Sequence, residues 1–222
     1  MFRELIKIMT EKTTLLEQME LQFQEMLKKG KTMFVFATNL LEDNREHTQD
    51  LAKNIFPIDQ ELNDLECKIR AEITTHISTA GADNLAQILI FLSSVKDAER
   101  IGDYVKNIYE IDPYIKNISQ NEVGNNLIRI KNETKVMFDR VYSLFSNKGM
   151  VEREQLYNDI ISIKKECQTI IDSLLDPDLV LDNKVAYALL TRYMKRVLAH
   201  LSNITAATIS PVNKVGYTNR ED

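Results

Sequence analysis

Long stretches in which apolar residues recur every three or four positions alternate along the chain with short polar breaks. This spacing places apolar residues on one side of a helix, whereas a strand would show a period of two. It predicts six helices, at about 11–42, 45–77, 83–111, 127–147, 151–175 and 183–209. A short amphipathic leader, residues 1–10, is expected before them, and residues 211–222 are expected to form a loose tail.

The turn-forming residues agree with this pattern. Only six glycines and four prolines occur in 222 residues, which is too few for a many-stranded sheet protein. Gly30 is expected to loosen the first helix, and Pro57 to kink the second or mark its boundary. The third helix is expected to open at Gly81-Ala82-Asp83 and to close at Asp112-Pro113. The sequence therefore predicts an all-α fold of long antiparallel helices.

The last three helices repeat markers of the first three, in the same order and at nearly constant spacing. The recurring pairs are Met33-Phe34 with Met137-Phe138, Asp59 with Asp159, Glu66-Cys67 with Glu166-Cys167, Arg100 with Arg196, and Asn107 with Asn203. The alternative is chance similarity between helices of common composition. We predict two tandem three-helix bundles, residues 1–115 with the leader and residues 116–222 with the tail, and a boundary in the polar stretch 116–126.

Charge and hydropathy exclude several classes of protein. A formal net charge of −5 without a basic stripe argues against a nucleic-acid binder. The longest apolar run, residues 85–92, is shorter than the ~20 residues that a membrane helix needs. The first residues carry charge and resemble no signal peptide, so we expect a cytoplasmic protein. Cys67 and Cys167 lie too far apart for a zinc or redox motif and are expected to be reduced packing residues.

Candidate ligand residues lie on the third predicted helix, where the apolar stripe of residues 85–95 continues into Glu99, Asp103 and Asn107. Carboxylates on an inward face must be paired, protonated or bound to a cation. Glu99 and Asp103 are one turn apart, so their oxygens could converge on one point. On the second helix, Asp59, Asn63 and Glu66 share a face at i, i+4 and i+7 and could add ligands.

Two interpretations of this acidic set stay open at this point. An all-oxygen shell suits iron or another oxygen-preferring cation, and it does not suit zinc. Alternatively, Glu99 and Asp103 form salt bridges with Lys96, Arg100 or Lys106 on neighbouring turns or helices.

The segment Asp97-Ala98-Glu99-Arg100-Ile101-Gly102-Asp103-Tyr104-Val105-Lys106-Asn107-Ile108 resembles the D-x-E-R-I-G-D-x-x-x-N-I signature of PhoU proteins. A weaker resemblance extends from about residue 11 to 210. It implies a cytoplasmic protein of two three-helix bundles that restrains phosphate import, together with a phosphate transporter subunit and a sensor histidine kinase. A homo-dimer is a further expected partner arrangement.

The resemblance also implies roles for individual residues, because some PhoU proteins bind metal ions, iron among them, on their E-x-x-x-D faces. It makes Glu99, Asp103, Asp59 and Glu66 the candidate metal ligands. Supporting or motif positions are Asp97, Arg100, Asn107 and Asn63.

The second half departs from the signature. Lys195, Leu198 and Ala199 replace Glu99, Gly102 and Asp103, while Asn203 is retained. A lysine in place of one carboxylate and an alanine in place of the other should abolish cation binding there. Lys195 is instead expected to pair with an acid such as Asp159 or Glu166.

Two other functions compete with a regulatory one. A helical adaptor without any ligand is the first. A carboxylate-bridged metal enzyme is less favoured, because di-iron bundles use Glu-x-x-His pairs and this chain has none. His47, His76 and His200 are interpreted as surface or packing histidines. No catalytic residue is predicted, and the chain is expected not to be an enzyme.

Overall fold

The computed structural model describes residues 2–43, 49–80, 85–145 and 152–209, and these residues are almost entirely helical. The elements are α1 (Phe2–Asp43), α2 (Gln49–Ala80), α3 (Leu85–Ile111), the 3₁₀ turns η1 (Asp112–Tyr114) and η2 (Ile118–Gln120), α4 (Glu122–Phe145), α5 (Arg153–Leu174) and α6 (Lys184–Ala207). The described residues contain no strand. The predicted all-α fold is confirmed.

Three predicted boundaries differ from those observed. Residues 2–10 belong to α1, so the expected leader and first helix form one helix of 42 residues. Pro57 lies inside α2 and does not mark its boundary. The polar stretch 116–126 ends inside α4, which begins at Glu122. The Asn121 side-chain oxygen caps this helix by accepting a hydrogen bond of 2.7 Å from the Gly124 amide.

Gly30 does not loosen α1, which runs through it without interruption. A Cβ atom at this position would lie 3.3 Å from Ile101 Cγ2, so the missing side chain lets α3 approach α1 closely. The predicted opening at 81–83 and the predicted tail at 211–222 lie outside the described residues.

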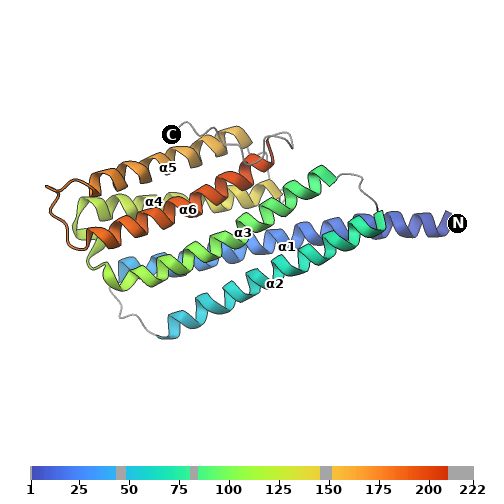
Figure 1. Cartoon of the computed structure of the whole chain (residues 1–222), viewed down its shortest axis with the longest axis horizontal. Coiled ribbons are helices and arrows are strands. Elements are labelled where there is room, and N and C mark those ends of the chain that lie inside the picture. The colour runs from blue at the N-terminus through green and yellow to red at the C-terminus, as the bar shows by residue number, and fades with distance from the viewer. Residues whose placement is uncertain (1, 44–48, 81–84, 146–151, 210–222) are drawn as a thin grey trace.

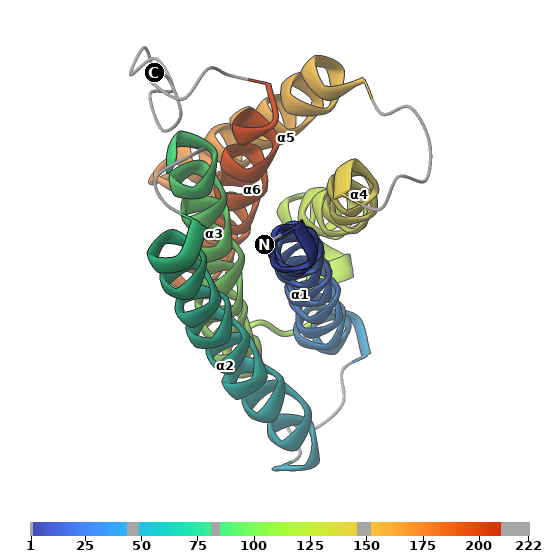
Figure 2. The same cartoon turned by 90° about the vertical axis from the view of Figure 1, so that its right-hand side faces the viewer.

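The helices pack as two groups of three that share one apolar core (Figure 1). Helices α1, α2 and α3 contact one another, as do α4, α5 and α6, and the groups join through α3 with α6 and α1 with α4. Figure 2 shows α2, α3, α6 and α5 as a curved layer, with α1 and α4 packed against one side of it. Over the residues described, no helix has the length and apolar character needed to cross a bilayer.

Residues that the predicted repeat makes equivalent meet where the two groups join. The rings of Phe34 on α1 and Phe138 on α4 lie 5.6 Å apart between centroids. The rings of Tyr104 on α3 and His200 on α6 stack with centroids 5.5 Å apart. These two residues are separated along the chain by as many positions as Arg100 and Arg196, so the predicted repeat makes them equivalent. Two units packed about an approximate two-fold axis would give these contacts. The repeat itself, and the boundary at residues 115 and 116, stay predictions.

We predict that Phe34→Ala and Phe138→Ala each lower the free energy of unfolding by about 3–5 kcal/mol, because both side chains are fully buried (0% and 1% exposed). The double variant should cost less than the sum, by about 0.5–1.5 kcal/mol, because the first truncation already removes the ring contact. Denaturant unfolding measures this. Phe36→Ala, on a residue 38% exposed, is the control and should cost much less. Strict additivity of the two core truncations would contradict a stabilising ring contact.

Candidate functional site

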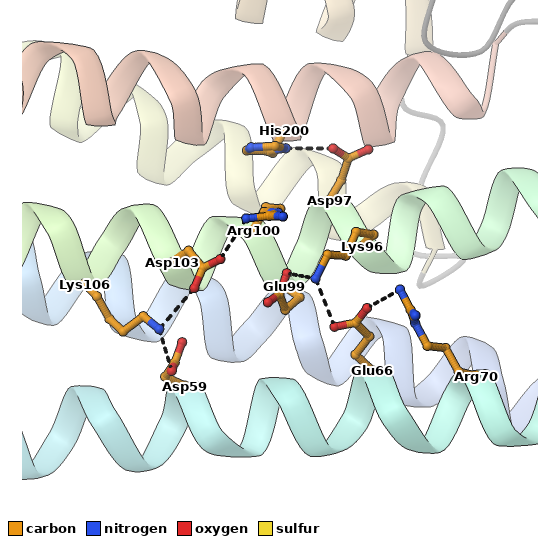
Figure 3. A network of polar contacts seen from close by, with 10 residues as sticks. All are labelled: Asp59, Glu66, Arg70, Lys96, Asp97, Glu99, Arg100, Asp103, Lys106 and His200. Atoms are coloured by element: carbon orange, nitrogen blue, oxygen red, sulfur yellow. Dashed lines mark hydrogen bonds and ion pairs between the residues drawn. The ribbon is translucent and has the colours of Figure 1, made fainter.

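Gly102 sets the distance between α2 and α3. A Cβ atom there would lie 2.9 Å from Leu62 Cδ1 and 3.2 Å from Asp59 Oδ1, both on α2. The absent side chain therefore allows α2 to pack close to α3. This approach brings the acidic residues of α2 opposite those of α3 (Figure 3).

Asp59 and Asp103 face each other across a lysine. Lys106 Nζ lies 2.8 Å from Asp59 Oδ2 and 3.1 Å from Asp103 Oδ1, and Arg100 Nη1 lies 3.4 Å from Asp103 Oδ2. Burial alone would lower the pKa of Lys106, but its hydrogen bonds to Asp59 and Asp103 outweigh burial and raise that pKa above the ordinary value. Lys106 is therefore a protonated link between the two helices at neutral pH.

Glu66 and Glu99 form a second pair, also about a lysine. Lys96 Nζ lies 2.7 Å from Glu99 Oε2 and 3.4 Å from Glu66 Oε2, and Arg70 lies 2.7 Å from Glu66 Oε1. The two glutamate side chains are only 9% and 10% exposed. Burial opposes the charge of Lys96, yet hydrogen bonding and attraction from Glu99 and Glu66 raise its pKa. Glu99 Oε2 is buried and, among the described residues, has this ion pair but no hydrogen bond of good geometry.

The four predicted ligands thus form two pairs, and each pair already surrounds an ammonium group. Glu99 and Asp103 turn to different lysines and do not converge on one point. Within the described part of the chain, no three acidic, histidine or cysteine side chains are grouped to hold a metal ion. Hard cations prefer oxygen ligands, and here the carboxylate oxygens already face ammonium groups, so a metal ion at these residues stays a prediction. Asn63 and Asn107 are half-buried and make no side-chain hydrogen bond among the described residues.

Asp97, the first residue of the signature, acts away from this acidic face. Its Oδ1 lies 2.7 Å from His200 Nδ1 and accepts a 3.0 Å hydrogen bond from Asn203 Nδ2, both on α6 (Figure 3). On the same face of α3, the Tyr104 hydroxyl accepts a 3.0 Å hydrogen bond from Arg196 Nε, and the guanidinium lies 5.1 Å from the ring centroid. These residues join the two bundles.

The interpretation of His200 as a packing residue is confirmed, since it is buried and stacked on Tyr104. His76 is buried as well, and His47 lies outside the described residues. Cys167 is a buried packing residue as expected, whereas Cys67 is exposed.

The expected pairing of Lys195 with Asp159 or Glu166 is wrong. Lys195 Nζ donates a 2.5 Å hydrogen bond to Gln168 Oε1 instead. Asp159 pairs with Arg140 at 2.5 Å, and Glu166 pairs with Arg129. Both arginines lie on α4, so Asp159 and Glu166 pair with α4 and not with Lys195 of α6.

The fold is a pair of three-helix bundles, and the acidic face and the signature lie on its second and third helices. The model of the PhoU domain family matches residues 23–111, which include the whole signature and the acidic residues of α2 and α3. The resemblance to the PhoU family is therefore confirmed over residues 23–111.

Proteins similar to this chain include a curated relative and a solved structure. The phosphate-specific transport system accessory protein PhoU homolog 1 of Thermotoga maritima is 30% identical over 121 residues, which cover 53% of this chain and 49% of that protein. The chain thus matches about half the length of this relative. The crystal structure of the phosphate transport system regulatory protein PhoU from Streptococcus pneumoniae aligns with 95% of this chain and 99% of its own, at a TM-score of 0.64 and 17% identity. That likeness shows the fold.

Replacing Gly102 by alanine should destabilise the protein, because the new methyl group would press on Leu62 and Asp59. We expect overpacking to cost about 1–3 kcal/mol, and the better helix propensity of alanine to offset at most about 1 kcal/mol of it. Ser93→Ala, at an exposed position of the same helix, is the matched control and should leave stability nearly unchanged. A Gly102→Ala variant as stable as wild type in denaturant unfolding would show that the α2–α3 distance does not depend on this glycine.

Proposed function

We propose that this protein is a non-enzymatic regulator that restrains phosphate uptake, acting in the cytoplasm by contact with a phosphate transporter subunit, a sensor histidine kinase or both. The observation that carries the proposal is the PhoU domain at residues 23–111, with the signature intact on α3. The description of the Thermotoga relative as an accessory protein of phosphate transport supports the same function.

The acidic face supports a contact role better than a catalytic one. Its carboxylates are neutralised by Lys96 and Lys106, so no acid is left poised beside a base or nucleophile among the described residues. The guanidinium-bearing side chains of Arg70 and Arg100 are about half exposed at its edge. A rigid pair of helices with such a polar edge suits recognition by another protein. A ligand-free adaptor is the alternative, and a homo-dimer remains within the proposal.

Deletion of the gene in its own host tests the regulatory proposal. We expect phosphate uptake to rise and phosphate-starvation genes to be expressed even in phosphate-rich medium, and a plasmid copy of the gene to restore both. Wild-type uptake and expression after deletion, in a host with no second copy of the family, would leave the ligand-free adaptor as the better account.

We also propose that a divalent metal can bind this face only by displacing a lysine. The double variant Lys96→Gln, Lys106→Gln removes both ammonium groups and should bind Fe²⁺ or Mn²⁺ at least about tenfold more tightly than wild type, because two repelling charges are gone. The matched variant Glu99→Ala, Asp103→Ala should lose whatever metal the wild type binds. Metal analysis and titration of the purified proteins measure both. Equal metal content in wild type and in the carboxylate variant would refute metal binding at these residues.

A further inference from the structure

Helices α5 and α6 lie side by side (Figures 1 and 2), and a cluster of three cations lies on them. Helix α6 is the one in which the second half departs from the signature. The cluster consists of Lys164 on α5 and of Lys195 and Arg196 on α6. Burial lowers the pKa of Lys164, and the positive charges of Lys195 and Arg196 lower it further. All three side chains are half-buried and near enough for their charges to interact.

The hydrogen-bond partners of these cations are all neutral. Lys164 Nζ donates to Ser202 Oγ at 3.3 Å, Lys195 Nζ to Gln168 Oε1 at 2.5 Å, and Arg196 Nε to the Tyr104 hydroxyl at 3.0 Å. In the described ranges, none of the three forms an ion pair with a carboxylate. The acids that could have served, Asp159 and Glu166, are engaged by arginines of α4 as described above.

The two halves therefore differ in charge balance at corresponding places. On α3, Lys96 and Lys106 each lie between a carboxylate of α2 and one of α3. On α5 and α6, three partly buried cations repel one another without a counter-ion, an arrangement that is costly unless an anion compensates it. Ala199 shares a face of α6 with Lys195 and Ser202, at i, i+4 and i+7, and adds no charge there.

We propose that Lys164, Lys195 and Arg196 form a binding site for a free oxyanion of the phosphate type. Such an ion carries between about one and two negative charges near neutral pH and has several acceptor oxygens, so it can compensate neighbouring cations and accept more than one hydrogen bond. Lysine ammonium groups suit it because each offers three rotatable donors. The site lies outside residues 23–111 and goes beyond regulation by protein contact.

Titration of the full-length protein with inorganic phosphate, at low ionic strength and neutral pH, tests this site by calorimetry. We expect saturable binding of one phosphate per chain, and sulfate should compete for it. Lys195→Gln should weaken binding at least tenfold. The control is Lys68→Gln, an exposed lysine on α2 that corresponds to Gln168 in the repeat, and it should bind as wild type does.

A second variant separates loss of binding from loss of folding. Ala199→Asp keeps all three cations and adds a counter-ion at the centre of their face, so it should abolish phosphate binding while the thermal midpoint stays the same or rises. Heat unfolding of each variant verifies the fold. Absence of saturable binding, binding that survives in Lys195→Gln and Ala199→Asp, or an equal heat signal with chloride at matched ionic strength would each overturn the proposal.

Discussion

The close packing of α3 between α2 and α6 is the constraint on which the rest of the arrangement depends. Gly102 lets α2 approach on one side, and Asp97 and Tyr104 bind α6 on the other. The signature on this helix therefore serves two interfaces at once. A wider spacing of α2 and α3 would separate the acidic pairs between them. Loss of the contacts with α6 would separate the two groups of helices.

Electrostatic balance explains why these acids tolerate burial. An isolated buried carboxylate costs several kcal/mol, but a lysine one turn away on the same helix supplies the partner without any long-range pairing. Lys96 and Lys106 lie three residues from Glu99 and Asp103 respectively, so each of these carboxylates is neutralised within its own helix. The same two lysines also pair with the acids of α2. Removing a lysine would therefore disturb two helices, although it belongs to one.

The fold was largely predictable, because long amphipathic periods and few turn formers leave little alternative to helices. The error at residues 2–10 arose because an amphipathic leader and the first turns of a helix have the same pattern. Helix pairing across the two groups was not predictable, since periodicity says which face is buried and not what covers it. The partners of Asp97 on α6 therefore came only from the structure.

The cationic cluster has a signal in the sequence. None of Lys164, Lys195 and Arg196 has an acidic residue three or four positions away on its own helix, whereas Lys96 and Lys106 each do. Local charge partners can be found from sequence alone. Whether another helix supplies a missing partner depends on tertiary packing. The pairing of Asp159 and Glu166 with arginines of α4 was therefore not predictable from the sequence.

The contacts of Phe34 with Phe138 and of Tyr104 with His200 have an evolutionary consequence. If the two units descend from one ancestral gene, a lone unit would have had to bury these surfaces against a second identical copy. Duplication and fusion would then have made that association independent of concentration. Fusion also ends the requirement that both copies stay alike. One unit can keep its carboxylates while the other changes the sign of its charge, so a former symmetric pair can acquire two specialised faces within a single polypeptide.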